Sequence, residues 1–173
     1  MAGATRGQDG LPSQTTTASR ARPLGVVALQ AVLLTAFFLA PRRQDWPVPA
    51  WLATAGSAAV IAGGATLLVA SFNLGRSLTP LPTPTRNATL RTGGLYGLVR
   101  HPIYSGLLGL VFGGTVQSAS VVKLALATAL LVLLNRKAAW EEDMLRRRYP
   151  GYDDYARRTP RFLPRLHRRP PSH

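Results

Sequence analysis

Residues 50–72 read AWLATAGSAAVIAGGATLLVASF, an unbroken run of 23 residues without a charged side chain. A helix needs roughly 20 apolar residues to cross the hydrocarbon core of a bilayer, and this run is long enough. It also lacks the polar face that a helix on the surface of a soluble protein presents to water. Small residues recur along it, including Gly56, Gly63 and Gly64, and they let helices pack closely in lipid. The run predicts a membrane-spanning helix.

Three further uncharged runs lie on either side, at residues 24–40, 103–122 and 124–134. Only Lys123 separates the last two runs. A turn near residues 117–120 would make them a helical hairpin, with the Lys123 ammonium reaching outward to the membrane interface. We therefore expect an all-α polytopic membrane protein with about four transmembrane helices. The alternative is a soluble helical protein whose apolar helices are buried in a core.

The distribution of charge predicts an orientation. The chain has 21 Lys and Arg against seven Asp and Glu, and eleven of these basic residues lie from residue 136 onward. Because cytoplasmic loops carry an excess of Lys and Arg, we expect both termini and the loop at residues 73–102 to be cytoplasmic. The basic tail would then face anionic lipid headgroups, and nucleic acid is the weaker partner. Arg far outnumbers Lys, and Ala and Pro are abundant, as in a high-GC bacterium, so we expect the bacterial cytoplasmic (inner) membrane.

The chain divides into three parts. Residues 1–22 are polar and lack the apolar core of a signal peptide, so we expect a disordered cytoplasmic leader. Residues 23–165 form the expected membrane domain, and residues 166–173 form a basic, Pro-rich tail. Three prolines at alternate positions within residues 77–85 favour an extended strap. The fourth helix continues as an amphipathic helix until Pro150 and Gly151 break it, and residues 152–158 can form one more short helix.

Two segments carry side chains suited to chemistry. Pro102 fits the first turn of the third membrane helix, which places Arg100 and His101 at the helix mouth. Free backbone N–H groups and the positive end of the helix dipole would make this helix N-terminus an anion-binding site. Farther along, Glu141 has Lys137 one turn earlier as its basic neighbour, so it can either receive a ligand or form a salt bridge. Glu142 and Asp143 each have an Arg four residues later, in positions 146 and 147.

Several kinds of site are not expected. The chain has no cysteine, and His101 is the only histidine outside the last seven residues, so we expect no thiolate chemistry and no metal site. The glycines at positions 93, 94 and 97 have the wrong spacing for a dinucleotide-binding turn. The residues alone predict a charged pocket at the cytoplasmic membrane face, without naming a reaction.

The same two segments resemble the isoprenylcysteine carboxyl methyltransferase and phospholipid methyltransferase superfamily. The first matching pattern consists of Leu90, Gly94, Tyr96, Arg100, His101, Pro102, Tyr104 and Gly106. The second consists of Glu141, Glu142 and Leu145, followed by tyrosines at 149, 152 and 155 and by the closing Pro-Arg-Phe-Leu-Pro at residues 160–164. The resemblance covers residues 73–165, and the combination of both patterns is more specific than either one.

The resemblance implies S-adenosylmethionine as the methyl donor and a lipophilic acceptor that enters from the membrane. Carried over by position, the cofactor-binding residues are Ala88, Thr89, Leu90, Arg91, Tyr96, His101, Pro102, Ile103, Tyr104 and Glu141. Arg100 and Glu142 are the candidate catalytic residues, and Lys137 is the candidate substrate-binding residue. Many relatives have an arginine at the position of Lys137. Their guanidinium offers several N–H donors in one plane, whereas the Lys137 ammonium is a compact point charge.

Two other functions fit parts of the sequence. Sterol reductases are similar to this superfamily in their C-terminal halves, so a membrane NAD(P)H-dependent reductase is one alternative. A non-catalytic membrane protein that keeps the pocket for sensing or assembly is the other. The sequence leaves the methyl acceptor open among carboxylates, amines, thiols and phenols.

Overall fold

The computed structural model describes residues 14–74, 90 and 92–165 of the chain. These residues form six helices and no strand, which confirms the all-α prediction for the described part. In chain order the helices are α1 (Gln14–Leu39), α2 (Ala50–Leu74), α3 (Leu95–Leu98), α4 (Pro102–Ser118), α5 (Val121–Arg148) and α6 (Tyr152–Arg158). The expected proline strap at residues 77–85, most of the leader and the tail at residues 166–173 lie outside the described residues.

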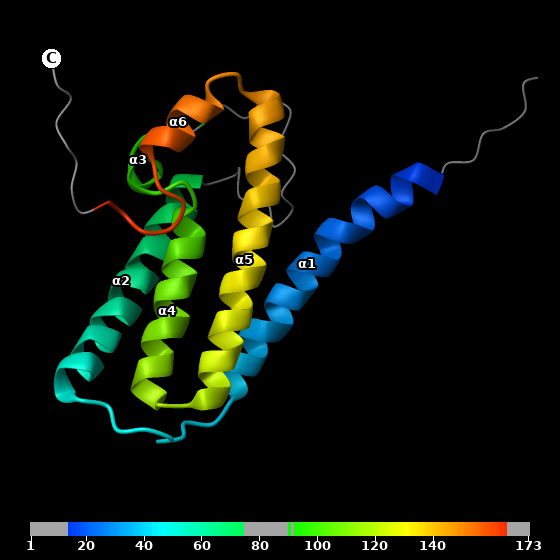
Figure 1. The fold of residues 1–173 in the computed structure, drawn as a ribbon. Helices are drawn as coiled ribbons and strands as arrows, with labels where there is room; N and C mark the ends of the chain where they lie inside the picture. Colours follow the sequence, from blue (N-terminus) through cyan, green and yellow to red (C-terminus); the bar gives the residue numbers. More distant parts are fainter. Residues whose placement is uncertain (1–13, 75–89, 91, 166–173) are drawn as a thin grey trace, which may run out of the picture.

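The long helices form a single row in which α2 packs on α4, α4 on α5, and α5 on α1 (Figure 1). The short helix α6 folds back from the end of α5 toward the start of α4 (Figure 1). Apolar side chains of α1, α4 and α5 make the core between these three helices, with Phe37, Leu107, Leu108, Val111, Ala127, Leu130 and Leu134 at its centre. The row therefore places the start of α4 beside the end of α5, where the two motif segments lie.

Most helix boundaries agree with the sequence analysis. The helix α2 covers the predicted run at residues 50–72, and α6 covers the predicted residues 152–158. The hairpin turns where expected, because α4 ends at Ser118, Ala119 adopts the left-handed conformation, and the Ser120 side chain caps α5. The helix α1 begins earlier than expected, so residues 14–22 are helical rather than part of a disordered leader. Once the apolar part of α1 is helical, each added residue costs little, because nucleation is the expensive step.

Lys123 does not reach outward, contrary to the prediction. Its side chain is buried, and its Nζ lies 5.1 Å from the centre of the Phe37 ring. The helix α1, which carries Phe37, covers this side of α5. The ammonium therefore rests against the face of an aromatic ring instead of extending to the interface.

Among the described helices, α2 alone is long and apolar enough to cross a membrane, over residues Ala50–Phe72. The apolar part of α1, Leu24–Leu39, is shorter. The helix α4 has 17 residues, or about 26 Å of helix, and α5 carries Lys123 and Lys137 along its length. The predicted set of four membrane spans is therefore supported for α2 and stays a prediction for the other three helices.

The apolar side chains of α2 are largely exposed, which a core helix of a soluble protein would not show. Trp51, Ile61 and Phe72 are 71%, 73% and 82% exposed. A continuous apolar surface of this kind is unfavourable in water and favourable against lipid chains. The exposed side of α2 therefore indicates a membrane protein.

The helices α2 and α4 approach so closely that their contact requires glycine. A Cβ atom added to Gly63 would lie 2.6 Å from the carbonyl oxygen of Gly106 and 2.8 Å from the backbone nitrogen of Leu110. A Cβ added to Gly106 would lie 2.6 Å from the carbonyl oxygen of Gly63. Backbone atoms of a packed helix cannot move aside locally, so the helices themselves would have to separate.

We expect Gly63→Ala to lower the free energy of unfolding by about 1–3 kcal/mol, the usual cost of overpacking. The measurement is thermal unfolding in detergent, followed by tryptophan fluorescence. Gly64→Ala is the matched control, because its nearest contact would be a side-chain carbon of Leu110 at 3.7 Å. The control should be neutral or stabilising by roughly 0.5–1 kcal/mol, since Ala favours a helix over Gly. Equal stabilities of the two variants would contradict the close packing.

Candidate functional site

The start of α4 is fixed by the chain that follows α6. The backbone N–H groups of Arg100 and His101 donate to the carbonyl oxygens of Pro160 and Arg161, at 2.8 and 3.1 Å. The Ser105 hydroxyl donates to the carbonyl oxygen of Phe162 at 2.7 Å. The N–H groups of Arg100 and His101 are thus hydrogen-bonded within the protein and are not available to an anion. Fewer N–H groups can therefore bind an anion at the start of α4 than the sequence predicted.

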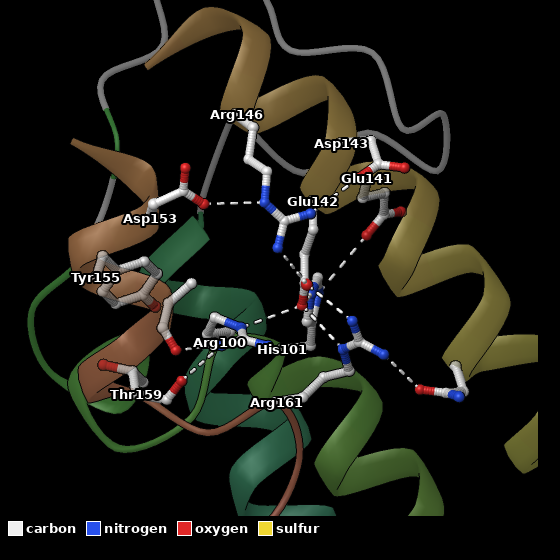
Figure 2. A network of polar contacts seen from close by, with 12 residues as sticks. Arg100, His101, Glu141, Glu142, Asp143, Arg146, Asp153, Tyr155, Thr159 and Arg161 are labelled. Atoms are coloured by element: carbon white, nitrogen blue, oxygen red, sulfur yellow. Dashed lines mark hydrogen bonds and ion pairs between the residues drawn. The ribbon is translucent and has the colours of Figure 1, made fainter. Parts of the chain in front are cut away.

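Glu142 is the centre of a network of charged side chains (Figure 2). Its side chain has no exposed surface. Arg161 binds it with two parallel hydrogen bonds, from Nε to Oε1 at 2.9 Å and from Nη2 to Oε2 at 2.8 Å. Arg100 Nε donates to Oε1 at 3.1 Å, His101 Nε2 lies 3.2 Å from the same oxygen, and Arg146 Nη2 lies 3.7 Å from Oε2. Side chains from three separate segments therefore meet on one buried carboxylate.

The surroundings of Glu142 hold it in the ionised form. Burial by itself raises the pKa of a carboxyl group, because the charged form loses water. The hydrogen bonds from His101 and Arg161 and the charges of Arg100 and Arg161 act in the opposite direction and hold the pKa of Glu142 at about 2. An ionised carboxylate accepts hydrogen bonds only, so His101 Nε2 carries the proton that faces it.

Arg100 connects this network to α6. Its Nη1 donates to the carbonyl oxygens of Ala156 and Thr159, at 2.6 and 2.9 Å (Figure 2). These carbonyls lie in and just after the last turn of α6, where helix carbonyl groups lack partners within the helix. Nearby, the Tyr155 hydroxyl donates to the carbonyl oxygen of Tyr96 at 2.6 Å. Arg100 therefore attaches α6 to the start of α4.

Arg146 forms the outer part of the network. It donates to Asp143 at 2.8 Å and to Asp153 at 3.0 Å, and all three side chains are well exposed. The predicted pairing of Asp143 with the arginine at position 147 is wrong, because Asp143 pairs with Arg146 three residues later. The predicted pairing of Glu142 with Arg146 is present at 3.7 Å.

Glu141 differs from Glu142 because part of its side chain, 18%, is exposed. The Tyr104 hydroxyl donates to its Oε1 at 2.7 Å, and His101 Nδ1 lies 3.6 Å from its Oε2. The His101 ring stacks on the Tyr104 ring, with centres 5.3 Å apart and nearly parallel planes. The carboxylate is thus oriented by two neighbours and still has surface to offer a ligand.

Lys137 is directed toward α1 rather than toward Glu141. The residue as a whole is only 8% exposed. Its Nζ donates to Gln30 Oε1 of α1 at 3.2 Å and lies 5.2 Å from the centre of the Tyr104 ring. Burial lowers the pKa of Lys137, and the charge of Glu141 opposes that shift. The salt bridge to Glu141 that spacing allowed is replaced by a hydrogen bond to Gln30, because α1 packs over this face of α5.

The structure brings together about half of the predicted site residues. Six of them come from two segments about 40 residues apart and lie in one connected cluster: Arg100, His101, Tyr104, Lys137, Glu141 and Glu142. Pro102 is the first residue of α4 and is buried, while Leu90, Tyr96 and Ile103 are partly buried. Ala88, Thr89 and Arg91 lie outside the described residues.

Two residues of the cluster were not predicted as site residues. Arg161 appeared only as part of the closing Pro-Arg pattern, which was a signal for its importance. Gln30 is one of two polar side chains in the apolar run at residues 24–40, and a polar group in such a run often has a function. The described residues contain no group of three or more His, Cys, Asp or Glu side chains able to hold a metal ion.

Comparison with known proteins gives a match to the phospholipid methyltransferase family over residues 51–151. The nickel-cobalt-cadmium resistance protein NccN of Alcaligenes xylosoxydans xylosoxydans is 36% identical over 118 residues, 67% of this chain and 55% of that protein. The cobalt-zinc-cadmium resistance protein CzcN of Cupriavidus metallidurans is 39% identical over 82 residues, 47% of this chain and 38% of that protein. Protein-S-isoprenylcysteine O-methyltransferase B of Arabidopsis thaliana is 31% identical over 127 residues, 70% of this chain and 62% of that protein. The chain spans about half the length of the curated relatives it matches.

Proposed function

Since the chain belongs to the phospholipid methyltransferase family, we propose that it transfers a methyl group from S-adenosylmethionine to a lipophilic acceptor at the cytoplasmic membrane face. The family and the apolar helix α2 indicate a membrane methyltransferase. One observation carries the more detailed proposal. The family match includes Arg100, His101 and Tyr104 as well as Glu141 and Glu142, and these side chains form one cluster at the junction of α4 and α5.

The residues of this cluster suit S-adenosylmethionine. Glu141 is a partly exposed carboxylate in a fixed orientation, and a carboxylate can bind the ammonium group or the ribose hydroxyls of this cofactor. When bound, the cofactor supplies a methyl group on a cationic sulfur. We propose that the contacts come from Glu141 and from Leu90, Tyr96, His101, Pro102, Ile103 and Tyr104, with Ala88, Thr89 and Arg91 completing them.

We assign Arg100 and Glu142 a positioning role in place of the catalytic role expected from the sequence. Glu142 is completely buried and already binds three arginines and His101, so it has no surface for a substrate. Arg100 is occupied by Glu142 and by two carbonyl oxygens. Methyl transfer depends mainly on alignment of the nucleophile with the methyl group and on exclusion of water. Holding α4, α5 and α6 together serves both needs.

We propose that residues 23–165 act as one membrane domain in the bacterial cytoplasmic (inner) membrane, with both termini and the charged cluster on the cytoplasmic side. The exposed arginines near the end of α5 then face anionic headgroups. Reporter fusions check this orientation, because a periplasmic signal from a fusion at Arg148 would place the cluster on the wrong side.

Binding calorimetry on the full chain in detergent tests the proposed cofactor. We expect saturable binding of S-adenosylmethionine and none of NADPH. Incubation with labelled S-adenosylmethionine and a lipid extract of the host should then give a labelled lipid, identified by mass spectrometry. Binding of NADPH alone would favour a reductase. Binding of neither compound would favour a membrane protein without catalytic activity.

A further inference from the structure

Lys137 is a buried cation that makes no direct ion pair with any described residue. It lies between α1, α4 and α5, where its described contacts are a neutral amide and an aromatic ring. In the described part of the chain no Asp or Glu forms an ion pair with it, and the nearby Glu141 is engaged by Tyr104 and His101. The charge of Glu141 acts on Lys137 only from beyond ion-pair distance, so part of the cost of burying the ammonium remains. An anion that reaches this ammonium is bound more strongly than in water.

The chemistry of Gln30 fixes the direction of its amide. The Lys137 ammonium can only donate, so the Gln30 atom that it binds is the oxygen. The NH₂ group is attached to the same amide carbon as this oxygen and carries two N–H donors. No described residue accepts a hydrogen bond from this NH₂ group. Lys137 and Gln30 together therefore present adjacent donors from two different helices.

This pair reproduces what one arginine provides. A guanidinium offers two parallel donors that fit the two oxygens of a carboxylate or phosphate, whereas an ammonium is a point charge. The Lys137 ammonium supplies the charge, and the Gln30 amide supplies a second donor beside it. Gln30 belongs to α1, which lies outside the residues 51–151 that match the family. The second donor is therefore contributed by a part of the chain that the family match does not include.

We propose that Lys137 and Gln30 together bind an oxyanion on the methyl acceptor, the carboxylate or phosphate group of a lipid. Gln30 is then a second substrate-binding residue, and α1 contributes to substrate specificity. The identification of this lipid as the methyl acceptor rests on the proposed methyltransferase function, whereas binding of the anionic lipid does not.

The test measures binding of three lipids by the full chain in uncharged detergent micelles. Dodecanoate, dodecyl phosphate and dodecanol share one alkyl chain and differ in the head group, so the tighter of the two anions identifies the oxyanion. We expect dodecanol to bind more weakly than that anion. Gln30→Leu should weaken binding of the anion about 10- to 100-fold, the value of a hydrogen bond to a charged group, and leave dodecanol unchanged.

Repeating the Gln30→Leu substitution in a Lys137→Arg protein shows whether Gln30 acts by hydrogen bonding or by packing. A guanidinium at this position supplies both donors, so adding Gln30→Leu to Lys137→Arg should weaken anion binding less than about 2-fold. Equal losses in the Lys137 and Arg backgrounds would overturn the proposal, because Gln30 would then act through packing. A loss of dodecanol binding that matches the loss of anion binding would overturn it for the same reason.

Gln30→Glu is a control that separates a loss of anion binding from a folding defect. The new carboxylate keeps the hydrogen bond from Lys137 and removes the two N–H donors, so the fold should persist while anion binding is lost. Anion binding equal to that of the unchanged protein would overturn the proposal. S-adenosylmethionine affinity, measured on the same samples, should be unaffected by all Gln30 variants. If the unchanged protein binds the anion but not S-adenosylmethionine, the proposed methyltransferase function fails and the oxyanion site stands.

Discussion

Glu142→Gln should destabilise the protein more than any other single substitution in the charged cluster. The change keeps the size of the side chain but leaves Arg100, Arg161 and Arg146 around a neutral amide. Removing one partner of a buried ion pair typically costs about 3–5 kcal/mol, because the remaining charge is buried without compensation. Arg146 and Arg161 are partly exposed and can reach water, so we expect about 3 kcal/mol. For a chain of this size the melting temperature should fall by roughly 6–12 °C.

Asp143→Asn is the matched control for that measurement. Asp143 is the next residue on α5 and pairs with Arg146, but both side chains are well exposed. An exposed ion pair contributes about 0–1 kcal/mol, so the melting temperature should change by no more than a few degrees. Tryptophan fluorescence can follow both variants, since Trp140 lies on the same helix. Equal destabilisation by the two substitutions would show that Glu142 does not hold the segments together.

The stability that comes from Glu142 and its basic partners should depend on pH. The folded-state pKa of Glu142 is about 2, below the ordinary value for a glutamate, so the unfolded chain binds this proton more readily. Stability from Glu142 is therefore fully present above the ordinary glutamate pKa and is lost as the pH falls through the range down to about 2. The loss of stability over this range should be smaller in Glu142→Gln. The same slope in both proteins would contradict the assignment.

The helical architecture could be predicted because each long helix has a local signal in the sequence. The uncharged run at residues 50–72 predicts α2 by length and composition. The turn between α4 and α5 follows from the polar residues Gln117, Ser118 and Ser120, and α6 follows from the break at Pro150 and Gly151. The burial of Lys123 could not be predicted, because it depends on α1 packing over α5, a contact between segments far apart in the chain.

The clustering of the two motif segments could be predicted from the sequence, but the pairing of their side chains could not. Both motif segments were recognised, and their side chains do lie together. Spacing along α5 suggested that Lys137 would pair with Glu141, since the sequence shows only neighbours on the same helix. The structure adds Gln30 from α1, which takes the place of Glu141 beside Lys137, and Arg161 from the chain after α6, which joins Arg146 on Glu142. Segments far apart in the chain compete for the same partners, and this competition decides such pairings. A single sequence does not show which distant segments come into contact.

The two adjacent glutamates illustrate the same limit. Glu141 and Glu142 are neighbours in the sequence, yet one keeps exposed surface and the other has none. Successive residues on a helix point about 100° apart, so one faces the junction with α4 and α6 while the other lies nearer its edge. This difference separates a residue that stabilises the fold from one that can bind a ligand, and it provides a direct test of the proposed cofactor site.

Glu141→Gln should weaken binding of S-adenosylmethionine by about 1.5–3 kcal/mol, or roughly 10- to 100-fold in Kd. The amide keeps the size of the side chain and can still accept from Tyr104, so the loss reports the charge that faces the cationic ligand. The melting temperature without ligand should fall far less than in Glu142→Gln. Among the described residues Glu141 has one ion pair, with His101 at 3.6 Å, and it keeps exposed surface. Calorimetry with S-adenosylmethionine on Glu141→Gln and on Asp143→Asn makes the comparison, and Asp143→Asn should bind as the unchanged protein does. A large fall in melting temperature with unchanged affinity for S-adenosylmethionine would make Glu141 a structural partner of His101 and Tyr104, and the cofactor would then have to bind elsewhere.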